Sequence, residues 1–466
     1  STTDRATLLD IKVIQNENID SLGNAGKVTI YKYRSGDIEL ASSTYSGLID
    51  VSVITTLKFD LRGNALEQGI ARYSDKDLAT VIETQNIISS YDFHDRQIHS
   101  SITTRNSLGL FVDRQEIDYL SYDLYGNVID QTITRFNELD TPIDFKVIHN
   151  TYDNLVAARR GNATHSTITR YEGSSADPLK LIDRQEISNL MFDLIGNIVD
   201  QTIDLYVGEL LSRETLIHNA DISNRGDAKI QEITTYITDE QGTLIPQEAS
   251  YQVIDNRTFD SDRNVLDQQV LNYLDSTKAV LLDMQEIRNE SFDSRGNVLI
   301  QRIATYSTQD RATLLDIKLI QNEDLDSLGN AGKVTISKYR SGDIELSSST
   351  YSGLIDVSVI TTLKFDLRGN ALEQEIARYS DLGLANIIET QTITSTYDFH
   401  DRQVHSSITT RNSLGLFVDR QEIEYLSYDL YGNVIDQTIT RYDETDTAID
   451  FKVIHNTYDN LVAARR

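Results

Sequence analysis

The chain repeats itself, because residues 1–160 return as residues 307–466 with a constant offset of 306 residues. The two copies differ at 20 of 160 positions, and most changes are mild, such as Ile98 to Val404. A tandem array adds units along one axis, and each unit packs mainly on its neighbours. We therefore expect one complete large repeat over residues 1–306 and a partial second copy over 307–466. Since the chain lacks an initial Met and stops within a unit, we expect it to belong to a longer array.

A shorter period lies inside the large repeat. Its clearest example is YDLYGNVIDQTITRF at residues 122–136, and FDLIGNIVDQTIDLY at 192–206 is a close relative. Units anchored on the Ile of the Q-x-I pattern recur every 30 to 40 residues, which gives nine units of about 34 residues in the large repeat. Each unit has an outgoing segment, a variable loop and a return segment such as IDRQEISNLMFD at 182–193.

Both segments of a unit alternate between two faces. In the outgoing segment Gln131 and Ile133 share a face. In the return segment Asn189 and Met191 share a face, with Leu190 on the other. A period of two residues indicates a β-strand. The abundance of β-branched residues favours strands as well.

The return strand of one unit is joined to the next outgoing strand by the sequence Asp-x-x-Gly-Asn. Asp at the start of a type I turn accepts hydrogen bonds from its own backbone two residues on, and Gly supplies a positive φ. Asp95 and Arg263 occupy the Gly position in two units. We expect a tight hairpin with a bulge at each turn. The clearest predicted turn residues are Asp60, Gly63, Asn64, Asp123, Gly126, Asn127, Asp193, Gly196, Asn197, Asp293, Gly296 and Asn297.

The Q-x-I pattern places Gln and Ile at equivalent positions of successive units. Stacked side by side, they would form a side-chain amide ladder beside an Ile ladder, which would stiffen the sheet. Ordinary cross-strand packing is the alternative, and its consequences are similar. The predicted ladder residues are Gln68, Ile70, Gln131, Ile133, Gln201, Ile203, Gln301 and Ile303.

Pairs of titratable residues recur at fixed spacing. Asp113 and Glu116 are three residues apart, as are Asp183 with Glu186 and Asp283 with Glu286. On a strand, residues three apart point to opposite faces, so such a pair does not meet at one bond as acid–base catalysis requires. His94 and His99, five apart, also lie on opposite faces and do not share a metal ion. We expect no enzymatic activity and no cofactor.

Calcium is the one cofactor alternative that the sequence leaves open. The chain has 72 Asp and Glu against 43 Lys and Arg, a net charge of −29. The Asp-x-x-Gly-Asn turns, with Asp130 or Asp200 four residues beyond the Gly, resemble calcium loops in composition. They lack the alternating ligands and the terminal Glu of an EF-hand, and turn chemistry alone accounts for them.

The charge and composition also bear on partners and location. An acidic surface repels nucleic acid and anionic membranes. No apolar run approaches the ~18 residues of a membrane span. The absence of Cys removes disulfides and thiolate metal sites, and it fits a repetitive bacterial surface protein. We expect an extracellular or cell-surface protein whose partners are further repeats of its own chain or neighbouring chains.

The turn motif is similar to that of a known family. An aromatic residue and Asp, then two residues, Gly and a strand, occur at Phe59–Asp60, Tyr122–Asp123, Phe192–Asp193 and Phe292–Asp293. This pattern resembles the YD-repeat (RHS/teneurin-like) family. The resemblance implies tandem β-hairpins in one long sheet that spirals into a hollow shell or tube, and it implies an association with an enclosed toxin.

Together these observations predict an all-β protein of tandem β-hairpins in one continuous antiparallel sheet. We expect the sheet to coil, because right-handed twist accumulates over many strands. The predicted function is structural: a segment of a long extracellular fibre, stalk or sheath. The alternative is a YD-repeat-like shell or adhesin stalk associated with a toxin or an adhesive tip.

Overall fold

A computed structural model of the chain describes residues 11–37, 44–223, 225–260, 262–293, 295–344 and 350–458. Within these ranges, 27 strands form one open antiparallel sheet, and helix is confined to two short segments. The predicted all-β class and the continuous sheet of tandem hairpins are confirmed.

The chain divides into two compact units. Compact unit 1 comprises residues 1–181, 258–265 and 291–297. Compact unit 2 comprises residues 182–257, 266–290 and 298–466. Unlike the sequence repeat, this division does not fall at residue 306.

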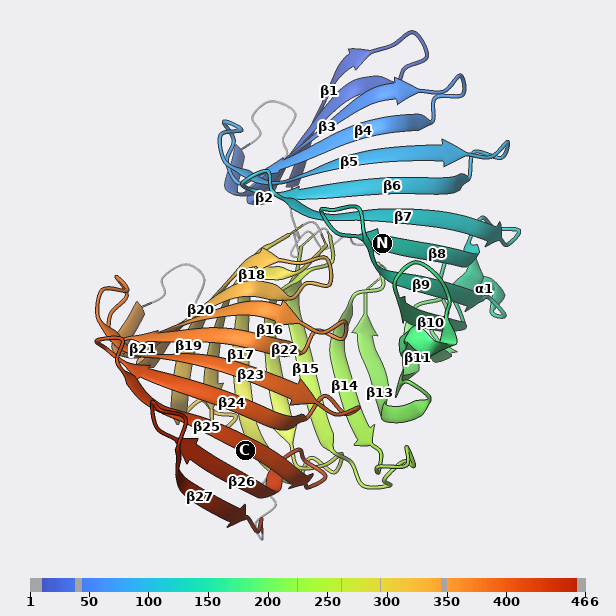
Figure 1. Ribbon diagram of the computed structural model, residues 1–466. Coiled ribbons are helices and arrows are strands. Elements are labelled where there is room, and N and C mark those ends of the chain that lie inside the picture. The colour runs from blue at the N-terminus through green and yellow to red at the C-terminus, as the bar shows by residue number, and fades with distance from the viewer. Residues whose placement is uncertain are drawn as a thin grey trace. The chain divides into compact units, whose positions relative to one another are not determined.

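Compact unit 1 contains a ribbon in which each strand pairs antiparallel with the next in chain order, from β1 to β10. Figure 1 shows β3 to β9 lying side by side in this order. Its strands are β1 (Ile11–Ile19), β2 (Ala25–Asp37), β3 (Thr44–Phe59), β4 (Ala65–Tyr73), β5 (Val81–Tyr91), β6 (Gln97–Asn106), β7 (Phe111–Tyr122), β8 (Val128–Phe136), β9 (Pro142–Thr151) and β10 (His165–Glu172).

The remaining strands lie largely in compact unit 2 and follow the same antiparallel order. The first nine are β11 (Leu181–Phe192), β12 (Ile198–Val207), β13 (Leu210–Ile222), β14 (Ala228–Ile237), β15 (Ser250–Phe259), β16 (Val265–Tyr273), β17 (Leu281–Phe292), β18 (Val298–Tyr306) and β19 (Leu314–Leu325). The others are β20 (Ala331–Asp343), β21 (Thr350–Phe365), β22 (Ala371–Tyr379), β23 (Ile387–Tyr397), β24 (Gln403–Asn412), β25 (Phe417–Tyr428), β26 (Val434–Tyr442) and β27 (Ala448–His455).

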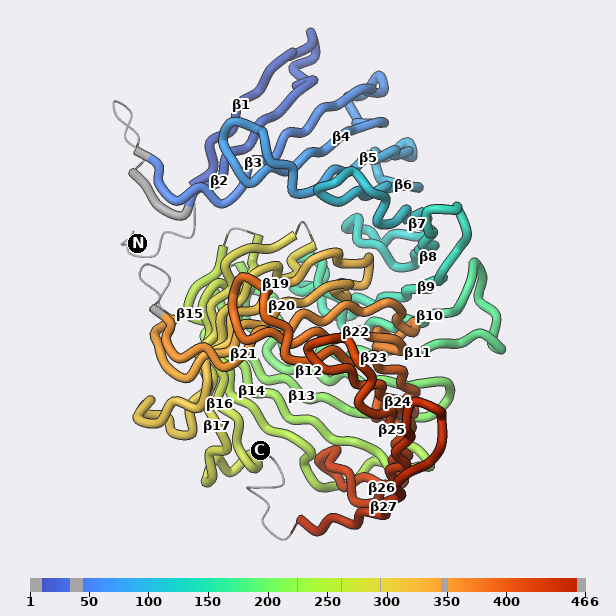
Figure 2. Tube along the Cα trace, turned by 60° about the vertical axis from the view of Figure 1, so that its left-hand side comes forward, coloured from blue at the N-terminus to red at the C-terminus, as the bar shows by residue number. Residues whose placement is uncertain are grey.

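Within compact unit 2 the sheet bends back on itself. The loop between β14 and β15 and the start of β13 contact the turns that precede β24 and β26 (Figures 1 and 2). The joined residues are 162 to 188 positions apart in the sequence. A cluster of buried apolar side chains lies between β18, β19 and β20, around Ala304, Ile317 and Tyr339.

The strands are less regular than the sequence pattern predicts. A shift in register separates Asn189 from Met191, so Met191 lies opposite Asp200 and not on the face of Asn189. The extra residue is Leu190, and Leu120 holds the same place in the β7–β8 pair. Both leucines are more than 60% exposed. The predicted alternation over this return segment is therefore wrong beyond Asn189, because a β-bulge changes the face of every residue after it.

Two connections also differ from a simple hairpin turn. The extra residues after Asp153 form a short helix, α1 (Leu155–Ala158), and Pro178–Lys180 form a single 3₁₀ turn. The side chain of Asn154 accepts hydrogen bonds from the backbone N–H groups of Val156 and Ala157, as an N-cap does. The inserted residues therefore satisfy their backbone groups locally.

Candidate functional site

The Asp-x-x-Gly-Asn turns all share one geometry. In the turn at residues 123–127, Asp123 Oδ1 accepts hydrogen bonds from the backbone N–H groups of Tyr125 and Asn127, both at 2.8 Å. Gly126 has a φ of 86°, in the left-handed region that disfavours side chains. The predicted turns at residues 60–64, 193–197 and 293–297 repeat these contacts. Asp95 and Arg263, at the Gly position, have φ of 61° and 71°.

The Asn of the motif also links neighbouring hairpins. Asn64 Nδ2 donates to Asp60 Oδ2 in its own turn at 3.0 Å and to Asp95 Oδ1 in the next turn at 2.8 Å. Asn127 and Asn197 reach the next connection in the same way, through the carbonyl oxygens of Ala158 and Ser223. This role of the Asn was not predicted from the sequence. The recurrence of Asn directly after the Gly could have indicated it, because the turn geometry alone does not require an amide side chain at that position.

A glycine of one turn lies close to the Asn of the turn before it. A Cβ on Gly63 would lie 2.9 Å from Asn24 Oδ1, and one on Gly296 would lie 2.8 Å from Asn264 Oδ1. At Gly126 a Cβ would meet nothing within 4 Å. The motif glycine therefore allows the positive φ of its own turn. At Gly63 and Gly296 the missing Cβ also leaves space for the Asn of the preceding turn.

In eleven of the described hairpins the anchor Ile of the outgoing strand lies opposite an Ile of the preceding return strand. The pairs are Ile14 with Ile30, Ile54 with Ile70, Ile87 with Ile102, Ile117 with Ile133, Ile148 with Ile168, Ile187 with Ile203, Ile217 with Ile233, Ile320 with Ile336, Ile360 with Ile376, Ile393 with Ile408 and Ile423 with Ile439. On its other side an anchor Ile lies opposite a polar residue of the next strand, as Ile133 does with Lys146 and Ile303 with Lys318. Directly opposed β-branched side chains are a main source of sheet stability.

The predicted glutamines are placed differently from a Gln–Gln ladder. Within its own hairpin, Gln201 Nε2 donates to Asn189 Oδ1 at 2.8 Å. Gln301 donates to Asn289 and Gln68 to Thr56 in the same manner. Gln131 and Gln201 lie opposite Ile148 and Ile217 of the next strand. In an antiparallel meander a return strand separates two outgoing strands by nearly 10 Å, so equivalent glutamines are not neighbours.

The recurring carboxylate pairs have separate surroundings. Asp113 is 1% exposed, and its Oδ2 accepts from Gln115 Nε2 at 2.7 Å. Glu116 Oε1 instead accepts a hydrogen bond from the Ser101 hydroxyl, and Glu116 Oε2 lies 3.0 Å from His99 Nε2. Asp183, like Asp113, is buried. The members of a pair thus have different partners, as their opposite faces predict.

His94 and His99 likewise have separate surroundings. His94 lies exposed in its turn, with its ring against Phe93. His99 Nδ1 lies 2.8 Å from Asp118 Oδ1, directly across the strand pair. The same cross-strand contact joins His149 to Asp130. The two histidines therefore do not form one site.

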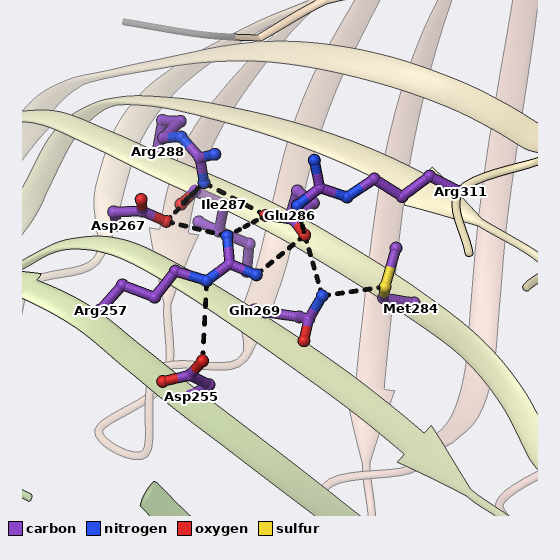
Figure 3. Close-up of polar contacts among 9 residues, drawn as sticks. All are labelled: Asp255, Arg257, Asp267, Gln269, Met284, Glu286, Ile287, Arg288 and Arg311. Carbon is purple, nitrogen blue, oxygen red and sulfur yellow. Dashed lines mark hydrogen bonds and ion pairs between the residues drawn. The ribbon is translucent and has the colours of Figure 1, made fainter. Parts of the chain in front are cut away.

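The third carboxylate pair contributes to a buried charge cluster, which Figure 3 shows. Glu286 on β17 is 1% exposed. Arg257 on β15 donates to both Glu286 oxygens, at 2.6 and 3.1 Å. Arg311, from the loop before β19, donates to Glu286 Oε1 at 2.6 Å. Gln269 Nε2 adds a contact at 2.9 Å.

The charges of this cluster balance. Arg288 contacts Glu286 and Asp267, and Arg257 lies 3.7 Å from Asp255. Three arginines therefore face three carboxylates. Burial by itself would raise the pKa of Glu286, but the hydrogen bonds and charges of Arg257 and Arg311 outweigh it and lower that pKa. Because donors surround both oxygens, the geometry suits an ion-pair network that joins β15, β16 and β17 rather than a catalytic base.

The turn carboxylates are likewise engaged by their own turns. Burial opposes the ionised form of Asp92, but hydrogen bonds from Arg96 and from the backbone of Arg96 and His94 lower its pKa to about 2. Asp130, at the position compared with a calcium loop, bonds Ser121 and His149. Among the described residues no three His, Asp or Glu side chains converge as metal ligands would. No helix in the described ranges is long and apolar enough to cross a membrane.

Comparisons with known proteins place few limits on the chain. No family model matches it, and no curated protein matches it. Similar solved structures include a chain of the Photorhabdus luminescens Tc holotoxin pore carrying a TccC3 mutation, at 10% identity and a TM-score of 0.13. Another is a chain of the TcdB2-TccC3 crystal structure, at 9% identity and a TM-score of 0.15. Both alignments cover 97% of this chain but only 33% and 39% of the other. TM-scores this low do not establish a shared fold.

Proposed function

We propose that the chain is a structural segment of a long extracellular fibre, stalk or sheath, and that it has no enzymatic activity. The observation that carries this proposal is the recurrence of one hairpin register in most of the described hairpins, with Ile–Ile pairs such as Ile14–Ile30, Ile117–Ile133 and Ile423–Ile439. A catalytic protein needs one distinct site, whereas a fibre needs equivalent joints at every step.

The links between turns support the same role. Neighbouring hairpins are joined by backbone pairing, and several are also joined through the motif Asn, as at Asn64 and Asp95. Such nearest-neighbour contacts let a sheet grow without changing its local structure. The net charge of −29 keeps a long polymer soluble by mutual repulsion.

Electron microscopy of the native material tests this function. We expect elongated objects whose length increases with the number of 306-residue repeats in the parent protein. Compact particles of one size, whatever the number of repeats, would contradict the proposal.

A second candidate is a coiled shell or adhesin stalk that carries a toxin or an adhesive tip. The observation in its favour is the bending of the sheet in compact unit 2, which brings the β14–β15 loop to the turn before β26. The parent reading frame distinguishes the candidates. A shell is expected to end in a distinct C-terminal cargo or tip domain, whereas a fibre continues to repeat.

A further inference from the structure

Four of the described turns lie against strands or loops that are far away in the sequence. They are the turns at residues 260–264 and 293–297 in compact unit 1, and those at residues 398–402 and 429–433 in compact unit 2. We call the third residue of each motif, directly before the Gly position, the contact residue. The contact residues of these four turns are Asp262, Arg295, His400 and Tyr431.

In compact unit 1 the contact residue Asp262 pairs with a buried lysine. Lys32 of β2 is 3% exposed, and its Nζ lies 2.7 Å from Asp262 Oδ2 and 3.2 Å from Asp260 Oδ2. Burial opposes the charged form of Lys32, but the hydrogen bond to Asp262 and the charges of both aspartates outweigh it and raise the pKa of Lys32. Lys12 Nζ lies 3.4 Å from Asp262 Oδ1. The turn therefore contacts strands that lie 228 to 250 residues earlier in the chain.

The next turn faces the same part of the sheet across a polar cavity. The contact residue Arg295 lines this cavity of about 250 Å³ together with Ser52 of β3 and Arg72 of β4. Arg72 stands two residues after the anchor Ile of its outgoing strand, as Lys32 does in the hairpin before it. The two turns thus meet basic side chains at equivalent positions of successive hairpins.

The contact residues of compact unit 2 meet uncharged polar groups instead. His400 Nδ1 lies 3.5 Å from Ser212 Oγ in β13. Tyr431 Oη accepts a hydrogen bond from Gln247 Nε2 in the β14–β15 loop at 2.5 Å. Burial lowers the pKa of His400, which favours the neutral imidazole beside a hydroxyl group. These partners lie 188 and 184 residues earlier in the chain.

The turn itself does not require a particular contact residue. The motif Asp binds only its backbone N–H group, at 2.9 Å for Asp262 and 2.8 Å for both His400 and Tyr431. In another turn the contact residue Arg62 points to the following turn, where its Nη1 lies 3.0 Å from Asp95 Oδ1. The side chain at this position can therefore vary without loss of the turn, and its contacts vary with it.

We propose that the contact residue is a specificity residue, which selects the earlier segment against which its turn packs. Asp262 selects a basic side chain such as that of Lys32, and Tyr431 selects an amide. Complementary charges and hydrogen bonds fix register, because a mismatched partner leaves a charge or a polar group unpaired. Since the hairpins are otherwise alike, these contacts set the register in which the sheet returns past itself. The inference rests on the proposed structural function, because a long array needs such a register.

Chemical labelling of lysine amines in the chain tests this selection. With a small acylating reagent, mass spectrometry should show Lys32 reacting several-fold more slowly than Lys338, whose side chain is 39% exposed. Asp262→Lys should raise the labelling rate of Lys32 several-fold. Asp262→Asn should raise it less, because it removes the attraction without adding a repulsion. Asp77→Lys makes the same charge change in an exposed loop and should leave Lys32 protected.

Exchange of the two residues separates selection from simple burial. Together with Asp260, the variant Lys32→Asp/Asp262→Lys keeps one lysine and two aspartates at the contact. The lysine introduced at position 262 should be labelled several-fold more slowly in this variant than in Asp262→Lys alone. Equal rates in the two variants, or an unchanged rate at Lys32 in Asp262→Lys, would overturn the proposal. Labelling is measured on single chains in solution, so its outcome does not depend on whether the parent protein forms a fibre.

Discussion

At the scale of single residues, one carboxylate and one amide define each Asp-x-x-Gly-Asn turn. Asp123 satisfies the backbone of its own turn, and Asn127 extends from that turn to Ala158. Asn can replace Asp in the first role, because Asn137 accepts from the backbone of Leu139 and Thr141, and Asp443 does the same in the second copy. The turn geometry therefore does not require the negative charge. The charge mainly affects how the stability of the fold depends on pH.

Acid is expected to destabilise the fold through these aspartates. Asp60, Asp92 and Asp123 have lowered pKa values, that of Asp92 falling to about 2. A lowered pKa means that the unfolded chain binds more protons, so this stability is complete above the ordinary Asp value of about 4 and is lost as pH falls toward 2. Thermal melts from pH 6 to pH 2 should show this decline. Asp92→Asn should make the decline shallower, and an unchanged pH profile would contradict the assignment.

Two glycines of the same motif are expected to respond unequally to alanine. Gly63 and Gly126 have φ of 91° and 86°, so each Gly→Ala change strains the backbone by about 1–2 kcal/mol. Only at Gly63 does the new Cβ also meet Asn24 Oδ1, at 2.9 Å. Chemical denaturation should show a larger loss of unfolding free energy for Gly63→Ala than for Gly126→Ala. Equal losses would mean that the neighbouring turn moves away without cost.

At the scale of strands and hairpins, the sequence predicts the structure correctly where residues close together in the chain determine it. The Gly of the turn and the Q-x-I alternation predict hairpins, and these follow from backbone sterics and from side-chain period. The bulge at Leu120 and the helix after Asn154 were not predicted, because an extra residue can enter a loop or a strand at similar cost.

Glu116, Glu186 and Glu286 stand in the same Gln-Glu-Ile context, yet only Glu286 is fully buried. Its cover comes from Arg257 and Arg311 on other elements, so no local signal identifies it.

Neutralising this glutamate is therefore expected to be costly. Glu286→Gln leaves the guanidinium groups of Arg257 and Arg311 near an uncharged amide. Removal of one partner from a fully buried ion pair costs about 3–5 kcal/mol; because these arginine side chains are 26 and 46% exposed, we expect a smaller loss of about 2 kcal/mol. Glu186→Gln is the matched control, since the Glu186 side chain is 32% exposed and pairs with Arg184 at 3.2 Å. Its loss should stay below about 1 kcal/mol. Similar unfolding free energies for the two variants would show that the cluster does not hold β15 to β17.

At the scale of the whole molecule, duplication has two consequences. Equivalent residues recur in equivalent strands, so the Ile117–Ile133 pair reappears as Ile423–Ile439. The same turns nevertheless differ in exposure, as Leu61 and Leu367 do. Nearly identical sequences therefore form the same hairpin, but the surroundings of that hairpin differ. Those surroundings depend on which other strands the bending sheet brings against it.

The axial length of one 306-residue repeat is the measurable consequence of this bending of the sheet. Nine hairpins laid flat, with strands ~4.8 Å apart, would advance ~86 Å for each 306-residue repeat. In compact unit 2, contacts join residues 162 and 188 positions apart, so the sheet returns past itself after fewer than 200 residues. If an array coils in this way and advances about one strand length, ~30 Å, at each return, the repeat should advance about 50–60 Å. Fibre diffraction or cryo-EM of the native material would measure this spacing. A value near ~86 Å would mean that the bend seen in compact unit 2 does not propagate, and the absence of any axial period would refute the fibre itself.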